Sequence, residues 1–418
     1  MSAASPAERR VAAAPWDALA RVAPPLDAEL VEVLGGATAE RVVDRALRAR
    51  RGLDGLARAV VAEAIFGVAL WRRRLRAQLG DADAPPAVLL AALLRDLGGR
   101  ADAAALAGVD AGALPPPRPP PAGLADRFSL PDWLAEEVAR AAGPDAPALA
   151  DALDRPGPVC LRANRLRIGR GALATALAAS GIATRPAPLA PDGLVVDGPR
   201  PNVYGLVAHR TGLVEVQDEG SQLLGALVGA RPGDAVVDAC AGAGGKTLLL
   251  AAAVGPAGRV YAVDPDAARL ARLRVRATRA GAEGIVSIEG PSAPPELRVD
   301  RVLVDAPCSE LGALRRGPDL RWRLDPATFP ALPALQLGIL ARAATHVRRG
   351  GRLVYATCTF RREEDEEVAL AFEAAHPEFV RAAPEADASV VTPDGFVRTW
   401  PHVHDTDGFF AAVWTRRG

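Results

Sequence analysis

The chain has 418 residues, of which 50% are hydrophobic, and its 50 basic and 50 acidic residues give a formal net charge of zero. This length predicts two or three domains with substantial cores. The balanced charge excludes an overall electrostatic attraction for nucleic acid, so any nucleic-acid surface must be a local patch.

The sequence shows no membrane or secretion signal. It has no apolar run of about 20 residues, and residues 1–15 lack the apolar stretch of a signal peptide. The four cysteines are Cys160, Cys240, Cys308 and Cys358, scattered without the spacing of metal ligands. We therefore expect a cytoplasmic protein with free thiols and no metal site.

The first part of the chain, residues 1–114, is predicted to form a helical domain. Apolar residues recur at helical spacing, for example over residues 60–68, and no strand pattern appears. Arginines cluster around residues 48–51 and 72–74. They could contact phosphates, although a solvated helix face is the simpler interpretation. The proline-rich stretch over residues 115–123 cannot continue a helix and predicts a stiff linker.

Two α/β regions are expected to follow. Residues 124–211 combine a helix at 133–142 with short strands, which predicts a small α/β module. In residues 212–418 short apolar runs alternate with helical segments, and this alternation predicts a mostly parallel sheet with helices on both faces. The predicted strands lie at residues 235–237, 260–263, 302–304 and 353–356, with a late antiparallel strand at 408–414.

A glycine-rich loop, residues 238–247, follows the first of these strands and opens a helix. A Walker A loop would need glycine at Cys240, and a dinucleotide fingerprint would need it at Thr247, so both patterns fail by one residue. Asp264 lies 22 residues after Gly242, where a carboxylate in such sheets binds ribose hydroxyls. A nucleoside cofactor without phosphates fits both features, and S-adenosylmethionine is one. A plain structural turn is the alternative.

Two cysteines lie at the ends of consecutive predicted strands. Asp305 and Cys308 follow one strand, and Cys358 follows the next. Ligands of parallel sheets bind beyond the carboxyl ends of the strands, so both thiols should lie near the reactive end of the cofactor. A lone buried cysteine is usually an inert small hydrophobe, which is our interpretation of Cys160.

A thiolate beside a methyl donor suits methylation of cytosine at C5. That carbon is a poor nucleophile, but a thiolate that adds to C6 turns C5 into an enamine-like carbon that can accept a methyl group. Asp305 is placed to support the ring at N3 if burial keeps its carboxyl protonated. Lys246 is the only lysine of the chain, which indicates a required compact ammonium unless it survives by chance.

Four blocks of the sequence resemble the RsmB/Sun-type RNA (cytosine-5) methyltransferases: residues 238–247, 305–322, 355–367 and 407–410. The resemblance covers the chain from about residue 123 onward. It implies a Rossmann-like class I methyltransferase domain with a mostly parallel seven-stranded sheet. It also implies that a small α/β RNA-binding module, marked by the sequence of residues 161–166, and a helical NusB-like domain precede the methyltransferase domain.

The resemblance further implies roles for single residues. Cys358 would be the nucleophile, Cys308 would assist product release, and Asp305 and Lys246 would belong to the base pocket. The cofactor would contact Cys240, Ala241, Gly242, Ala243, Gly244, Gly245, Lys246, Asp264 and Asp305.

The sequence departs from the family pattern in three places. Ala243 stands where the family usually has proline, and Glu310 stands where it often has glycine. An acidic or amide residue commonly meets the adenine near residues 289–292, and no clear equivalent occurs there, so the adenine contact is unassigned.

The implied substrate is RNA with an accessible cytosine, because a cytosine inside a helix hides C6 behind its stacked neighbours. The helical N-terminal region favours ribosomal RNA, with transfer RNA as the alternative. A basic-aromatic cluster after Cys308 could contact this RNA or form a solvated run. Its members are Arg315, Arg316, Arg321, Trp322 and Arg323.

Two other classes of function compete with this interpretation. A P-loop nucleotidase would need neither thiol. A non-catalytic ribosome-assembly factor could keep the fold only to hold RNA, although the two intact cysteine blocks argue against it. The acidic run at residues 363–367 indicates the first turn of a helix and not a metal site.

Overall fold

The computed structural model describes residues 4–23, 25–198 and 200–418, so the first three residues of the expected N-terminal domain lie outside the described residues. The chain forms two compact units. One contains Met1–Pro156 and the segment Leu314–Pro326, and the other contains Gly157–Ala313 and Ala327–Gly418. The domain boundaries expected at residues 114, 123 and 211 stay predictions.

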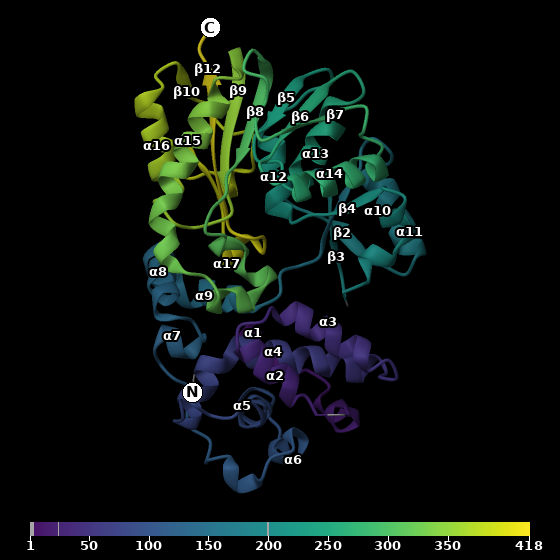
Figure 1. The fold of residues 1–418 in the computed structure, drawn as a ribbon, viewed down its shortest axis with the longest axis vertical. Helices are drawn as coiled ribbons and strands as arrows, with labels where there is room; N and C mark the ends of the chain where they lie inside the picture. The colour runs from purple at the N-terminus through teal and green to yellow at the C-terminus, as the bar shows by residue number, and fades with distance from the viewer. Residues whose placement is uncertain (1–3, 24, 199) are drawn as a thin grey trace. The chain divides into compact units, whose positions relative to one another are not determined.

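The first unit is helical, as its apolar spacing predicts (Figure 1). Helix α4 (Gly55–Leu79) begins where the Asp54 carboxylate accepts a hydrogen bond of 2.8 Å from the Ala57 N–H, and it ends at Gly80 in the left-handed region. The described part of residues 4–114 contains no strand, which confirms the expectation. The other α-helices are α1 (Pro6–Ala12), α2 (Asp27–Leu34), α3 (Ala39–Ala49), α5 (Pro86–Ala92), α6 (Ala103–Ala107), α7 (Leu124–Arg127), α8 (Asp132–Ala142) and α9 (Ala146–Asp154).

The inserted segment Leu314–Pro326 is folded into this helical unit through a buried arginine. Arg321, in the 3₁₀ helix η7 (Pro318–Trp322), is fully buried and donates a hydrogen bond of 2.7 Å to Asp154. Burial raises the pKa of Asp154 to about 7 although Arg321 opposes the shift. Arg315 is also buried. The interpretation of this cluster as a solvated run is therefore wrong at Arg315 and Arg321.

The second unit contains a small antiparallel sheet in the order β2-β3-β1-β4. Helix α10 (Arg170–Ala179) packs Leu173 and Leu177 against it. The sequence predicts strands here only at residues 159–161 and 194–196, the two inner ones, because β2 and β4 have three residues each. The strands are β1 (Cys160–Ala163), β2 (Thr184–Pro186), β3 (Gly193–Val196) and β4 (Val214–Val216).

The large sheet of this unit has the order β10-β12-β9-β8-β5-β6-β7, with β11 paired to β12. Its central strands are parallel, and β12 runs antiparallel to β9, which confirms the expected mostly parallel sheet. The described residues form eight strands and not seven, because the short β11 adds to the edge of β12. The strands are β5 (Ala235–Asp238), β6 (Arg259–Val263), β7 (Val286–Gly290), β8 (Val299–Asp305), β9 (Val347–Thr357), β10 (Phe379–Arg381), β11 (Val397–Thr399) and β12 (Phe409–Arg416).

Helices cover both faces of the large sheet (Figure 1). Alternate residues of each strand point to opposite faces, so Leu303 and Val354 join the core under α12, α13 and α14. Val304 and Tyr355 join the core under α15 and α16. The helices of this unit not yet given bounds are α11 (Val207–Arg210), α12 (Glu219–Leu227), α13 (Gly245–Val254), α14 (Ala267–Ala280), α15 (Leu332–Ala344), α16 (Glu366–Ala375) and α17 (Pro401–His404).

Two glycines permit a close approach of backbone beside the end of β9. The Gly312 N–H donates to the Cys358 carbonyl at 3.0 Å, and the Gly408 N–H donates to the Gly312 carbonyl at 2.9 Å. A Cβ atom on Gly312 would lie 2.0 Å from the Gly408 carbonyl oxygen. Only glycine therefore fits at Gly312.

We predict that Gly312→Ala lowers the free energy of unfolding by about 1–3 kcal/mol, because the added methyl group must displace backbone. Gly317→Ala is the matched control, since a Cβ atom there meets no heavy atom within 4 Å. The measurement is the thermal midpoint of each variant by circular dichroism. Equal midpoints for the two variants would contradict the close approach.

Candidate active site

A cavity of about 1130 Å³ opens at the carboxyl ends of β5, β6, β8 and β9. The strand ends bring together residues that the sequence spreads from 240 to 358, as expected for ligands of parallel sheets. Gly244 alone of the predicted site residues does not line it. The predicted residues that do are Cys240, Ala241, Gly242, Ala243, Gly245, Lys246, Asp264, Asp305, Cys308 and Cys358.

The glycine-rich loop is held in a conformation that requires glycine. Gly242 and Gly244 have φ values of 53° and 91°, and a Cβ atom on Gly244 would lie 2.2 Å from a methyl group of Leu273. The Asp264 carboxylate accepts hydrogen bonds from the N–H groups of Gly242, at 2.9 Å, and Asp266, at 2.8 Å. Asp264 thus fixes the loop from the end of β6.

Asp238, the last residue of β5, anchors the start of the glycine-rich loop. Its carboxylate accepts a hydrogen bond of 2.7 Å from the Thr247 hydroxyl, and burial raises the pKa of Asp238 to about 6. This bond joins the end of β5 to the first turn of α13.

The cavity fits a nucleoside cofactor better than a nucleotide polyphosphate. Each Asp264 oxygen can accept a second hydrogen bond, as from a ribose hydroxyl. The only lysine donates to Asp305 at 2.7 Å and does not reach over the loop as a phosphate ligand would. The segment whose adenine contact was unassigned contributes Pro291, Ser292 and Ala293 to the wall.

Lys246 and Asp305 form a largely buried ion pair in the cavity. Burial lowers the pKa of Lys246, but the neighbouring Asp305 carboxylate outweighs burial and holds this pKa above its ordinary value. The proton of the pair therefore resides on Lys246. The pair can donate a hydrogen bond through its ammonium and accept one through its carboxylate.

The two predicted cysteines lie in direct contact. The sulfur atoms of Cys308 and Cys358 are 3.4 Å apart, and the Cys358 N–H also points at the Cys308 sulfur, at 3.4 Å. The hydrogen bond with Cys308 and burial raise the pKa of the Cys358 thiol well above its ordinary value, and the charges of Asp305 and Glu310 add to the shift. Cys358 is therefore a neutral thiol at rest. Cys160 lies apart from the cavity lining, buried in β1.

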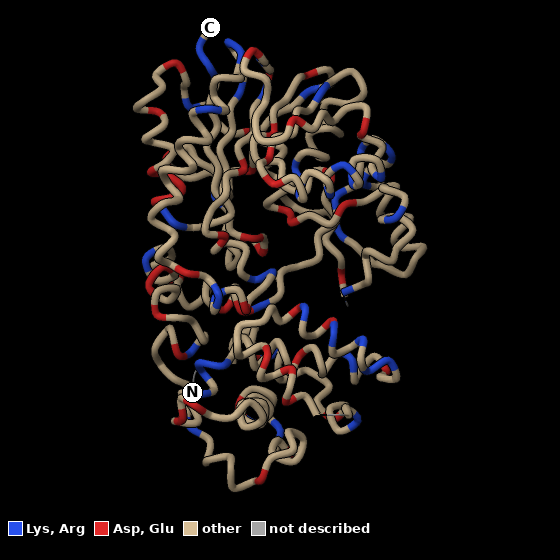
Figure 2. The backbone as a smooth tube through the Cα atoms, in the orientation of Figure 1, with Lys and Arg blue, Asp and Glu red and all other residues tan. Residues whose placement is uncertain are grey.

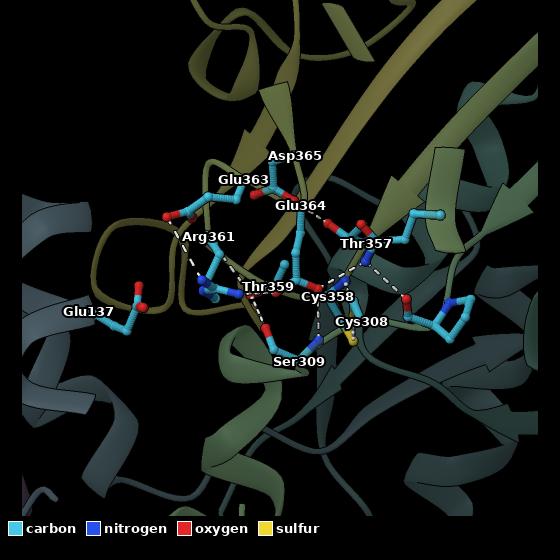
Figure 3. A network of polar contacts seen from close by, with 12 residues as sticks. Glu137, Cys308, Ser309, Thr357, Cys358, Thr359, Arg361, Glu363, Glu364 and Asp365 are labelled. Atoms are coloured by element: carbon cyan, nitrogen blue, oxygen red, sulfur yellow. Dashed lines mark hydrogen bonds and ion pairs between the residues drawn. The ribbon is translucent and has the colours of Figure 1, made fainter. Parts of the chain in front are cut away.

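A polar network fastens the two cysteine loops together (Figure 3). The Ser309 and Thr359 hydroxyls are hydrogen-bonded at 2.8 Å. The fully buried Glu364 carboxylate accepts hydrogen bonds from the Ser309 N–H and the Gln336 side chain, both at 2.9 Å. These contacts fix the residues that follow both cysteines.

The next carboxylate of the acidic run fastens the end of β9. Asp365 accepts hydrogen bonds from the Thr357 hydroxyl and from Arg398, the latter at 2.9 Å, and burial raises the pKa of Asp365 to about 7. The helix expected at this run is confirmed, since α16 begins at Glu366. The sequence did not indicate that two carboxylates of this acidic run, Glu364 and Asp365, support the cysteine loops. Their place a few residues after Cys358 could have indicated this role.

The small sheet contributes residues that the sequence did not single out. Arg162 of β1 is buried and donates a hydrogen bond of 2.8 Å to the Gly245 carbonyl of the glycine-rich loop. Burial lowers the pKa of Arg162 to about 10. Gln217 and Ser221 line the cavity itself. Gln217 directly follows β4 and Ser221 lies in α12, so the small sheet reaches the site through Arg162 and the residue after β4.

One departure from the family pattern, Glu310, places a residue with a side chain in a backbone conformation that favours glycine. Glu310 has a φ of 59°, the left-handed region where glycine is favoured, and it lines the cavity. Its carboxylate adds negative charge near Cys358.

Among the described residues, His, Cys, Asp and Glu side chains form no group of three or more that could hold a metal ion. The helices there include none that is both long and apolar enough to cross a membrane.

Comparison with known proteins gives two family matches. Residues 226–415 match the model of the 16S rRNA methyltransferase RsmB/F family, and residues 130–203 match the ferredoxin-like domain of RsmF/B-like methyltransferases.

Individual proteins agree with these matches. The chain is 35% identical to a probable ribosomal RNA small subunit methyltransferase B of Synechocystis sp., over 69% of this chain and 67% of the relative. It is 33% identical to the Bacillus subtilis protein described in the same words, over 71% and 68%. A crystal structure of a methyltransferase homolog from Pyrococcus horikoshii matches with a TM-score of 0.61 and 26% identity, over 71% of this chain and 98% of that one.

We predict that Glu364→Gln loosens both cysteine loops. The Ser309 N–H and the Gln336 side chain share one Glu364 oxygen, and Arg361 donates to the other at 3.3 Å. In either orientation the NH2 group of glutamine faces one of these donors, and each unsatisfied buried group costs about 1–3 kcal/mol. The thermal midpoint should fall, and alkylation of Cys358 by iodoacetamide, followed by peptide mass spectrometry, should become faster. Glu367→Gln, which removes an exposed carboxylate, should leave both values unchanged. Normal values for Glu364→Gln would contradict the bracing role.

We also predict that Glu310→Gln shifts the pH profile of Cys358 alkylation toward lower pH. The raised pKa confines the thiolate to alkaline solution, and removing a nearby negative charge lowers that pKa. At a fixed pH below the thiol pKa, alkylation should therefore accelerate. Glu283→Gln, an exposed carboxylate beyond α14, serves as the control. An unshifted profile for Glu310→Gln would refute the electrostatic coupling.

Proposed function

The chain belongs to the 16S rRNA methyltransferase RsmB/F family, and from this premise we propose that it methylates C5 of a cytosine in ribosomal RNA through a covalent bond from Cys358. It is an S-adenosylmethionine-dependent RNA methyltransferase. The observation that carries the covalent mechanism is the pair of cysteine sulfurs 3.4 Å apart in the wall of the cavity that contains the glycine-rich loop.

The residues that would hold S-adenosylmethionine surround this loop. Asp264 would accept hydrogen bonds from the ribose, Gly242 would let the backbone approach, and Pro291 and Ala293 would form the apolar wall. When bound, the cofactor supplies a methyl group on a positively charged sulfur. Asp305 and Cys308 line the same cavity and would lie toward that methyl group.

Cys358 would act as the nucleophile. Its thiol loses its proton to solvent water, and its sulfur forms a bond to C6 of cytosine while the electron pair of the C5–C6 double bond moves to C5. C5 then takes the methyl group. Loss of the C5 proton returns the electron pair to the ring, and the bond between sulfur and C6 breaks.

The neighbouring groups would manage the protons of this cycle. The sequence suggests a protonated Asp305 at N3. Because the proton of the pair resides on Lys246, Lys246, held by Asp305, would instead donate a hydrogen bond toward N3 and so stabilise the negative charge that the ring gains on thiolate addition. We assign removal of the C5 proton, and thus product release, to Cys308, because its sulfur directly contacts that of Cys358. Without it the covalent bond should persist.

The substrate would have to present an unstacked base. C6 is shielded inside a helix, so the target cytosine must lie in a loop or be flipped out. The two curated relatives are described as ribosomal RNA small subunit methyltransferases, which supports ribosomal RNA over transfer RNA. This substrate would place the protein in the cytoplasm, where ribosomes are assembled.

We predict opposite effects for the two cysteines. Cys358→Ala should abolish transfer of labelled methyl groups to ribosomal RNA from a strain lacking the gene. Cys308→Ala should instead accumulate a covalent protein–RNA adduct, visible as a shifted band in a denaturing gel. Cys160→Ala, a change outside the cavity lining, is the matched control and should do neither.

Normal transfer by Cys358→Ala would rule out its role as nucleophile. Absence of the adduct with Cys308→Ala would rule out proton removal by Cys308. Failure of the wild-type protein to methylate either naked RNA or isolated ribosomal subunits would favour the assembly-factor interpretation.

A further inference from the structure

The helical unit contains a cleft of about 600 Å³ beside the C-terminal half of α4. Three arginines of α4 line it: Arg72 and Arg76, which lie one turn apart on the same side of the helix, and Arg73. The charged and aromatic residues of its lining are Arg72, Arg73, Arg76, Asp81, Asp126 and Trp322.

Two arginines in this region are neutralised by carboxylates. Arg73 forms ion pairs with Asp126, at 2.6 Å, and Asp132, at 2.7 Å. Arg74 is buried and paired with Glu8. These ion pairs neutralise the charges of Arg73 and Arg74 within the helical unit.

Arg72 and Arg76 have no such neutralising partner. Within the described residues neither forms an ion pair, and the Nε atom of Arg76 is buried without a hydrogen-bond partner. Arg72 donates to the Leu34 carbonyl at 3.3 Å and lies over the Trp322 ring at 4.1 Å from its centre. Burial lowers the pKa of Arg72 to about 10, the positive charges of Arg76 and Arg321 add to the shift, and the Asp319 carboxylate offsets only part of it. The helical unit thus keeps two like charges together where an anion would stabilise them.

We propose that this cleft binds a phosphate group of the RNA substrate, with Arg72 and Arg76 as its cationic ligands. The identity of the ligand as RNA rests on the proposed function. Guanidinium groups match phosphate oxygens through paired N–H donors, and their planes also stack on bases. The stacking of Arg72 on Trp322 restricts the Arg72 guanidinium before binding, so less conformational entropy is lost when a ligand binds.

The size and charge of the cleft favour a nucleotide within a strand. Its volume lies within the range of about 300–1,000 Å³ typical of small-molecule sites and exceeds what a phosphate ion fills. Figure 2 shows basic and acidic residues interspersed along both units, so attraction of RNA must come from local sites of this kind. This cleft is such a site in the helical unit.

The test is equilibrium binding of ribosomal RNA fragments to the full-length protein across a range of salt concentrations. All variants carry Cys358→Ala and the methyl donor is left out, so a covalent adduct cannot contribute and failure of the covalent mechanism leaves the result interpretable. Arg76→Gln should weaken binding about fivefold and reduce the slope of log affinity against log salt by about 0.7–1, the loss of one phosphate contact. Arg76→Lys should restore the slope.

Arg48→Gln is the matched control, because it removes the same charge from an exposed arginine of α3 that already pairs with Asp44. Thermal midpoints exclude unfolding, and Arg72→Gln provides a second variant of the same cleft. An unchanged slope in both Arg76→Gln and Arg72→Gln would overturn the proposal. An equal loss of RNA affinity in Arg48→Gln would overturn it as well. So would binding of inorganic phosphate by a protein that does not bind RNA.

Discussion

The parallel pairing of β8 with β9 is the constraint on which the site depends. In this register Asp305 lies opposite Ala356, so the two strands end together and the loops that follow them start side by side. The cysteines, 50 residues apart in the chain, come within 3.4 Å of each other for this reason. A shift of one residue would turn every side chain of one strand to the other face. Glu364 then fixes the loop after β8 by accepting a hydrogen bond from the Ser309 N–H, and Asp365 fixes the end of β9 by accepting one from the Thr357 hydroxyl.

The second constraint is the sign of the charges around the thiols. Asp305 and Glu310 are negative, and the only lysine is bound to Asp305. Burial, the contact with Cys308 and these negative charges keep the Cys358 thiol protonated at rest. In the proposed mechanism the same ion pair later stabilises the ring that the thiolate attacks. Within this pair the Asp305 charge disfavours the thiolate at rest, whereas Lys246 would stabilise the ring during the proposed reaction.

Much of this site could be predicted from the sequence, because its signals are local. Buried parallel strands appear as short apolar runs, and the residues directly after them are the ones that meet at the edge of the sheet. The glycine-rich loop, Asp264, Asp305 and both cysteines follow this rule. The short strands β2, β4, β10 and β11 escape it, since three residues carry no periodic pattern. The five-residue strand β7 was not predicted either.

Residues that act through tertiary contacts could not be found in this way. Arg162 reaches the glycine-rich loop across 83 residues of sequence, and Arg321 reaches Asp154 across 167. The count of eight strands also depends on an edge pairing of β11 that no local pattern predicts.

The most direct test of the covalent mechanism is to offer the enzyme and S-adenosylmethionine an RNA that carries 5-fluorocytidine at the target position, because fluorine cannot leave C5 as a proton does. The covalent mechanism predicts a stable adduct, and after digestion the peptide that contains Cys358 should carry the methylated nucleotide on that residue. An adduct on Cys308, or methylated RNA without any adduct, would contradict it.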